Sequence, residues 1–113
     1  MVHLPEKGKR LRIFIGEDDH WNGRPLYEEI VRHARVMNLA GATVLRGIMG
    51  YGAASRIHSA KLLRLSEDLP LVVEIVDTPD KIEAILPFLD EVVKEGLITI
   101  EEVEVFKYRH NKD

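Results

Sequence analysis

An α+β fold is predicted for this chain of 113 residues by three observations. Apolar segments with the composition of β-strands occur four times, and two further segments repeat apolar residues with helical spacing. Along the chain these segments follow the order strand, helix, strand, strand, helix, strand. This order is the split βαβ, or ferredoxin-like, arrangement βαββαβ. It predicts a four-stranded antiparallel sheet with two helices on one face.

The first strand and the first helix are separated by a polar segment. Leu11, Ile13 and Ile15 alternate with other residues, which predicts a strand that ends at Gly16. Pro25 fits the first turn of a helix, and residues 38–41 end that helix. Four apolar residues recur along its face: Leu26, Ile30, Ala34 and Met37.

A long loop is predicted between the second and third strands. Residues 43–49 have strand composition, and Gly50 and Gly52 release the chain into a glycine-containing, basic loop over residues 50–61. Residues 61–65 can extend a strand out of the loop, and 66–70 form a turn or bulge. Residues 71–76 then give the strongest strand signal in the sequence.

The second helix follows Thr78, which can cap it, and Pro79 suits its first position. Pro87 predicts a kink and Gly96 a stop. Residues 99–108 form the last strand, and 109–113 form a frayed tail. The buried stripe of the helix is expected at Ile82, Ile85, Leu86, Leu89, Val92 and Val93.

The face of the sheet that the helices leave uncovered is expected to be partly apolar. Phe14 points away from the main apolar row of its strand, and Val72 and Val76 point away from their apolar neighbours. Large apolar patches are uncommon on monomers. A homo-oligomer that packs sheet against sheet is therefore expected, with a few stray apolar residues on an exposed sheet as the alternative.

Composition predicts one domain over residues 1–113 and a cytoplasmic protein. The net charge of −3 argues against a general nucleic-acid binder. No apolar run is long enough for direct membrane insertion, no secretory signal precedes the first strand, and the absence of cysteine excludes disulfides and thiolate metal sites. Charged residues reach 31% and glutamine is absent, which is a thermophile-like composition.

A long loop in a small domain usually carries function. Because the first two strands run in the same direction, residues 16–24, 50–61 and 94–97 should meet at one end of the sheet. Free N–H groups at the start of the first helix, with Arg24, Arg56, His58 and Lys61, would hold an anion such as a phosphate. The glycine pair alone favours a sharp turn over a phosphate cradle. Trp21 and Tyr51 are candidates either for stacking on a flat ring or for anchoring loop ends.

The whole pattern resembles the uncharacterised PII-like proteins of the nitrogen-regulatory PII superfamily, over about residues 10–108. Its most specific parts are GEDD at 16–19, GRPLYE at 23–28, GATVLRGIMGYG at 41–52 and SRIH at 55–58. The resemblance implies a PII-like regulatory domain that is a homotrimer. It also implies no obligatory cofactor, and an adenine nucleotide (ATP, ADP or AMP) bound between subunits. The loop would act on an unknown target protein, with a membrane transporter or channel among the candidates.

The ligand-binding residues that this resemblance implies are Arg46, Gly50, Tyr51, Gly52, Arg56, His58, Lys107 and Arg109. Gly50, Tyr51 and Gly52 would shape the base of the loop, and the basic residues would meet phosphates. Signalling PII proteins have a glycine-rich, lysine-bearing connection before the last strand, whereas residues 94–97 contain one glycine. Phosphate donors are therefore expected from the loop, from Arg46, or from Lys107 and Arg109 across a subunit boundary.

Two other functions remain open from the sequence. A divalent-metal-binding protein of the copper-tolerance type would use Asp18, Asp19, His20 or His58, although the histidines lack zinc-site spacing. A small hydrolase or transferase would depend on His58 or Asp18, but no nucleophile with an orienting acid is identifiable. We therefore expect a protein that is not an enzyme and has no dedicated metal site.

Overall fold

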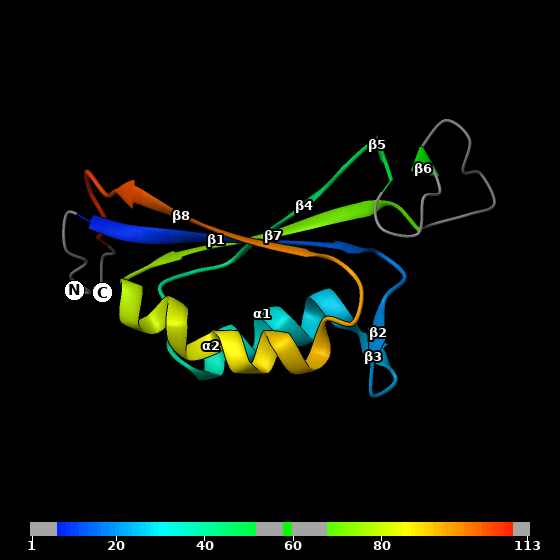
Figure 1. Ribbon diagram of the computed structural model, residues 1–113, viewed down its shortest axis with the longest axis horizontal. Helices are drawn as coiled ribbons and strands as arrows, with labels where there is room; N and C mark the ends of the chain where they lie inside the picture. Colours follow the sequence, from blue (N-terminus) through cyan, green and yellow to red (C-terminus); the bar gives the residue numbers. More distant parts are fainter. Residues whose placement is uncertain (1–6, 52–57, 60–67, 110–113) are drawn as a thin grey trace.

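The computed structural model describes residues 7–51 and 68–109, together with the backbone of residues 58–59. The main sheet is four-stranded in the order β4-β7-β1-β8, and every neighbouring pair is antiparallel. Its strands are β1 (Lys7–Gly16), β4 (Thr43–Arg46), β7 (Pro70–Asp77) and β8 (Leu97–Glu104). The helices α1 (Leu26–Val36) and α2 (Pro79–Val92) both cover one face (Figure 1). The predicted α+β, ferredoxin-like arrangement is therefore confirmed.

The core lies between the sheet and the two helices. The residues of β1 and β7 that were expected to face the helices are all buried, and so are most of the predicted helix stripes. His33 of α1 stacks on Phe88 of α2, with 3.7 Å between ring centroids. The buried apolar residues are Leu11, Ile13, Ile15, Leu26, Ile30, Ala34, Leu69, Leu71, Val73, Ile75, Ile82, Ile85, Leu89 and Val92.

A small hairpin precedes α1 that the sequence analysis missed. It pairs β2 (His20–Trp21) with β3 (Arg24–Pro25). Asn22 and Gly23, which connect these strands, have φ angles of 53° and 78°. An Asn-Gly pair with positive φ is the preferred connection of a two-residue hairpin. Pro25 consequently ends β3, and α1 begins one residue later.

Several predicted boundaries were wrong. The strand expected over 43–49 breaks after β4, where the Gly47 N–H donates to the Pro70 carbonyl (2.7 Å), and resumes as β5 (Met49–Gly50). The helix α2 includes Pro87 and ends at Val92, before Gly96, because the next residue, Val93, is extended with φ −92° and ψ 98°. The last strand ends at Glu104, opposite Lys7. Residues 61–65 lie outside the described residues.

Asp77, the last residue of β7, joins two connections at one end of the sheet: the one from α1 to β4 and the one from β7 to α2. Its side chain is buried, and its carboxylate accepts the N–H of Ala40 (2.8 Å) and of Thr78 (2.7 Å). The Tyr108 hydroxyl donates to the Ala40 carbonyl (2.8 Å). The chain after β8 is thereby held against the connection between α1 and β4. Neither helix of the described residues has the length and apolar character needed to cross a membrane.

Candidate functional site

The base of the long loop lies where four strand ends meet. In the register of the sheet, Gly16 stands opposite Pro70, Phe14 opposite Leu97, and Arg46 opposite Leu71. The segment after β1, both stems of the loop and the connection before β8 therefore emerge at one end of the sheet, as Figure 1 shows on its right-hand side. This confirms the convergence that the strand order predicted.

Hydrogen bonds tie the turn after β1 to the returning stem of the loop. The Glu17 N–H donates to the Leu69 carbonyl (2.8 Å), and the Asp18 N–H donates to Asp68 Oδ1 (3.0 Å). A Cβ on Gly16 would lie 2.6 Å from that same Asp68 oxygen, so the carboxylate can approach only because residue 16 is glycine. These contacts join the turn after β1 to the returning stem at the base of the loop.

Arg46, at the end of β4, forms an ion pair with Glu17. Its side chain is 60% exposed, whereas that of Glu17 is 20% exposed. Sequence reasoning assigned Arg46 to a phosphate and did not anticipate this acidic partner. The signal that would have suggested it is the acidic run 17–19, placed by topology at the same end of the sheet as Arg46.

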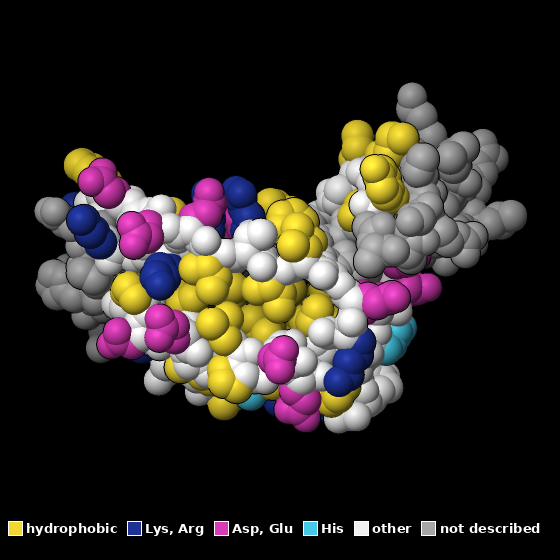
Figure 2. Space-filling model, viewed as in Figure 1, with side chains coloured by type: hydrophobic (Ala, Val, Ile, Leu, Met, Phe, Trp, Pro, Cys, Tyr) yellow, Lys and Arg dark blue, Asp and Glu magenta, His cyan; other side chains and the backbone are white. Residues whose placement is uncertain are grey.

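The other expected residues at the loop base are only partly described. Gly50 pairs with His58 of β6 (His58–Ser59) through the backbone. Tyr51 is 72% exposed, so it does not anchor the loop to the core. Gly52 and Arg56 lie outside the described residues. Figure 2 shows apolar side chains gathered near β5, where the exposed residues are Ile48, Met49 and Tyr51.

Lys107 and Arg109 lie at the end of the chain's main sheet that is opposite to Arg46. β8 runs antiparallel to β1, so that Glu104 is opposite Lys7 at the far end of the sheet from Arg46. Both basic residues are exposed, and the contact of Tyr108 with Ala40 holds this segment at that end. Within a single chain, Lys107 and Arg109 therefore do not lie beside Arg46.

Trp21 acts as an anchor, which was one of its two predicted roles. Its ring packs against the hydrophobic core, and the Lys94 ammonium lies 5.6 Å from the ring centroid. Lys94 belongs to the connection before β8. The cation–π contact therefore links that connection to the hairpin before α1.

Two of the residues proposed for a metal, Asp19 and His20, form side-chain hydrogen bonds within the turn after β1. Asp19 Oδ2 accepts the Gly16 N–H (3.0 Å), and His20 Nδ1 donates to the Asp18 carbonyl (2.6 Å). Among the described residues, no three His, Asp or Glu side chains are grouped to hold a metal ion. These contacts explain the acidic turn as a structural element, and no observation here favours the copper-tolerance alternative.

The uncovered face of the sheet carries both apolar and charged residues. Leu45 and Leu97 are 50% and 55% exposed on it, and Phe14, Val72 and Val76 are half-buried. This confirms that the second face is partly apolar.

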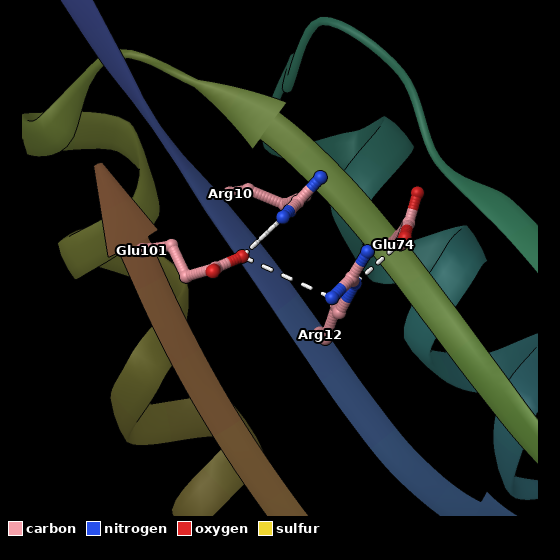
Figure 3. A network of polar contacts seen from close by, with 4 residues as sticks. All are labelled: Arg10, Arg12, Glu74 and Glu101. Atoms are coloured by element: carbon pink, nitrogen blue, oxygen red, sulfur yellow. Dashed lines mark hydrogen bonds and ion pairs between the residues drawn. The ribbon is translucent and has the colours of Figure 1, made fainter. Parts of the chain in front are cut away.

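Four charged residues form a network across the centre of this face (Figure 3). Arg10 pairs with Glu101, and Arg12 pairs with Glu74 (2.8 Å) and lies 3.9 Å from Glu101. The hydrogen bond from Arg10, aided by the charges of both arginines, lowers the pKa of Glu101 from its usual 4.5.

We expect this network to make stability depend on acid. Because the folded-state pKa of Glu101 lies below the unfolded value, its contribution is complete above about pH 5.5 and declines as the pH falls through 4.5 toward the folded pKa. The melting temperature of Glu101→Gln should therefore fall less than that of wild type between pH 6 and pH 3. Glu95→Gln, in the connection before β8, should keep the wild-type decline. Equal declines in wild type and Glu101→Gln would contradict the role of this pair.

The arrangement defines a ferredoxin-like α+β protein, and comparison with solved structures finds the same fold in a PII-like protein. The chain resembles CPII, a nitrogen regulatory PII-like protein from Thiomonas intermedia K12 bound to ADP, AMP and bicarbonate. The TM-score is 0.62, the identity is 14%, and the match covers 89% of this chain and 90% of CPII. A second CPII structure, bound to ADP and bicarbonate, matches with a TM-score of 0.60 at the same identity and coverage.

The chain belongs to the DUF190 family, described as "Uncharacterized ACR", whose model matches residues 8–105. A UPF0166 protein of Aquifex aeolicus is 46% identical over 101 residues, covering 88% of this chain and 93% of the relative. A UPF0166 protein of Methanocaldococcus jannaschii is 38% identical over 102 residues, covering 89% of this chain and 94% of the relative. The predicted membership in an uncharacterised family is confirmed, and the predicted fold is shared with the PII-like protein CPII.

Proposed function

We propose that this protein is a cytoplasmic PII-like regulator that binds an adenine nucleotide and is not an enzyme. The observation that supports this most is the convergence of the turn after β1, both loop stems and the connection before β8 around an exposed arginine. The same fold in CPII holds ADP and AMP. The guanidinium of Arg46 suits a phosphate, which it can meet through more than one N–H.

The nucleotide site is proposed to form between subunits of a homotrimer. Arg46 stands at one end of the sheet, and Lys107 and Arg109 stand at the other. A site that uses both groups of cations therefore needs a neighbouring copy. The exposed apolar residues of the outer face and of the edge strand β8, Leu45, Leu97 and Ile100, support such an assembly because association would remove them from water.

The loop over residues 50–61 is the proposed contact with a target protein, for which a membrane transporter or channel is the class we favour. The apolar side chains near β5 lie at the base of this loop. Ligand binding at the loop stems would change the stems' own contacts, and a target that binds one loop arrangement better would then detect the nucleotide.

Titration calorimetry with ADP, AMP, ATP and cyclic AMP tests the proposed function directly. We expect saturable heat with at least one of them, with the site count following the subunit count. Mass measurement in dilute solution should give about three times the chain mass of 12.9 kDa, as a closed symmetric trimer requires. Absence of heat with all four nucleotides would contradict the sensor, and a stable monomer would contradict the intersubunit site.

Mixed oligomers provide a sharper prediction about the subunit boundary. Arg46→Gln and Arg109→Gln should each weaken nucleotide binding alone. After unfolding and refolding together in equal amounts, roughly a quarter of the sites should combine an intact Arg46 with an intact Arg109 from a neighbour. High-affinity nucleotide binding should therefore reappear at about a quarter of the sites. Its complete absence from the mixture would place both residues in the site of one subunit, or exclude one of them from the site.

A further inference from the structure

The ion pair between Arg46 and Glu17 occupies a group that an anionic ligand would use. Arg46 Nη2 is the atom that meets Glu17, and the two residues are 29 positions apart in the chain. The arginine side chain is largely exposed while the carboxylate is mostly covered. The guanidinium of Arg46 therefore faces solvent, and the Glu17 carboxylate already neutralises part of its charge.

The position of the Glu17 carboxylate is set by the backbone around it. The Glu17 N–H is bound to the Leu69 carbonyl on the returning stem of the loop, and the next residue is bound to Asp68. Arg46 itself stands on the outgoing stem, directly before Gly47, which is bound to Pro70. The acid is thus presented to the arginine by the same contacts that close the base of the loop.

We propose that Glu17 is a built-in competitor for Arg46, so that a phosphate-bearing ligand must displace this carboxylate. The nature of the ligand rests on the proposed function. The exchange replaces one anion on the guanidinium by another, and it releases the side-chain tie between the turn after β1 and the outgoing stem. Ligand affinity is thereby held below what Arg46 alone would give, and binding is coupled to a change at the loop stem.

The test uses Glu17→Gln, which keeps the shape of the side chain and removes its charge. Asp18→Asn is the matched control, because it removes the same charge from the next residue. Asp18 is joined to the returning stem through its backbone N–H, which the substitution keeps. ADP and inorganic pyrophosphate are the two probes, titrated by calorimetry into wild type and both variants at one salt concentration. Glu17→Asp, which keeps the charge but shortens the reach, is the second variant should Glu17→Gln fail to fold.

We expect Glu17→Gln to bind ADP about 2- to 5-fold more tightly than wild type, which is the range set by a partly exposed ion pair. The affinity of Asp18→Asn for ADP should rise less, and that of Glu17→Asp should rise by a smaller factor than that of Glu17→Gln. If ADP binds wild type and Glu17→Gln equally, or binds the variant more weakly, the competition is refuted while the nucleotide site stands. If ADP binds none of the proteins but pyrophosphate binds Glu17→Gln more tightly, the competition stands and the nucleotide function falls. If neither probe binds any of the proteins, both proposals are overturned.

Discussion

Replacing Arg46 by glutamine is expected to weaken ADP binding by about 10- to 100-fold, the range for losing charge-assisted hydrogen bonds. The loss has two physical sources. The phosphate loses its donors on β4, and Glu17 is left without the cation that neutralises it, so that it repels the ligand. Arg46→Lys keeps the charge but lacks the planar set of donors, so its affinity for ADP should lie between those of wild type and Arg46→Gln.

The matched control is Arg32→Gln, which removes the same charge from the exposed side of α1. Arg32 pairs with Glu29 on its own helix, and this pair is separate from the loop base. Calorimetry with ADP should give a nearly unchanged affinity for Arg32→Gln, and melting curves should show that every variant is folded at the temperature of the titration. Equal affinities of Arg46→Gln and wild type would remove Arg46 from the site.

The two arginine environments explain why the loop base is suited to exchange. Glu29 is held by Arg32 at 2.9 Å and by Arg24 at 3.5 Å, and the Arg32 hydrogen bond lowers its pKa. Arg32 lies on α1, as Glu29 does, and Arg24 lies on the hairpin directly before that helix. Arg46 and Glu17, by contrast, lie on two segments that meet only through the register of the sheet. A ligand that takes Arg46 therefore changes how two distant segments are joined, whereas breaking the Glu29 contacts would affect one helix end.

The fold was predictable because the apolar spacing of Leu11, Ile13 and Ile15 and of the helix stripes is set by burial against a single core. Local turn chemistry was also present in the sequence, since Asn22-Gly23 has the composition of a hairpin connection. The break of the second strand at Gly47 was not predictable, because it depends on Pro70, which is distant in sequence and arrives through the pairing of β4 with β7.

The location of the candidate site was predictable from the sequence, but most of the contacts within it were not. Strand order alone was enough to bring the segment after β1 to the loop, because parallel orientation of β1 and β4 follows from the topology. The acidic run 17–19 suggests an acidic partner for Arg46, but residue spacing does not determine which of its three carboxylates meets the guanidinium. Arg56 and Gly52 lie outside the described residues, so their proposed roles stay predictions.

Gly96→Ala is expected to be strongly destabilising, although the residue is exposed and belongs to a short connection. Its φ of 155° is a backbone conformation in which side chains are strained, at a cost of about 1–3 kcal/mol. A Cβ there would also lie 2.5 Å from the Phe14 carbonyl oxygen and 3.2 Å from a methyl group of Val93. The carbonyl belongs to a central strand, β1, which cannot move without disturbing its pairing with both neighbours.

Gly41→Ala provides the comparison for this prediction. Gly41 lies in the connection between α1 and β4, where a Cβ would meet nothing within 4 Å. Chemical denaturation should therefore show Gly41→Ala within about 0.5 kcal/mol of wild type, as for other surface substitutions, while Gly96→Ala loses at least 1 kcal/mol. A Gly96→Ala protein as stable as wild type would mean that the connection before β8 can move away from Phe14. The close approach of this connection to the end of β1 would then be adjustable.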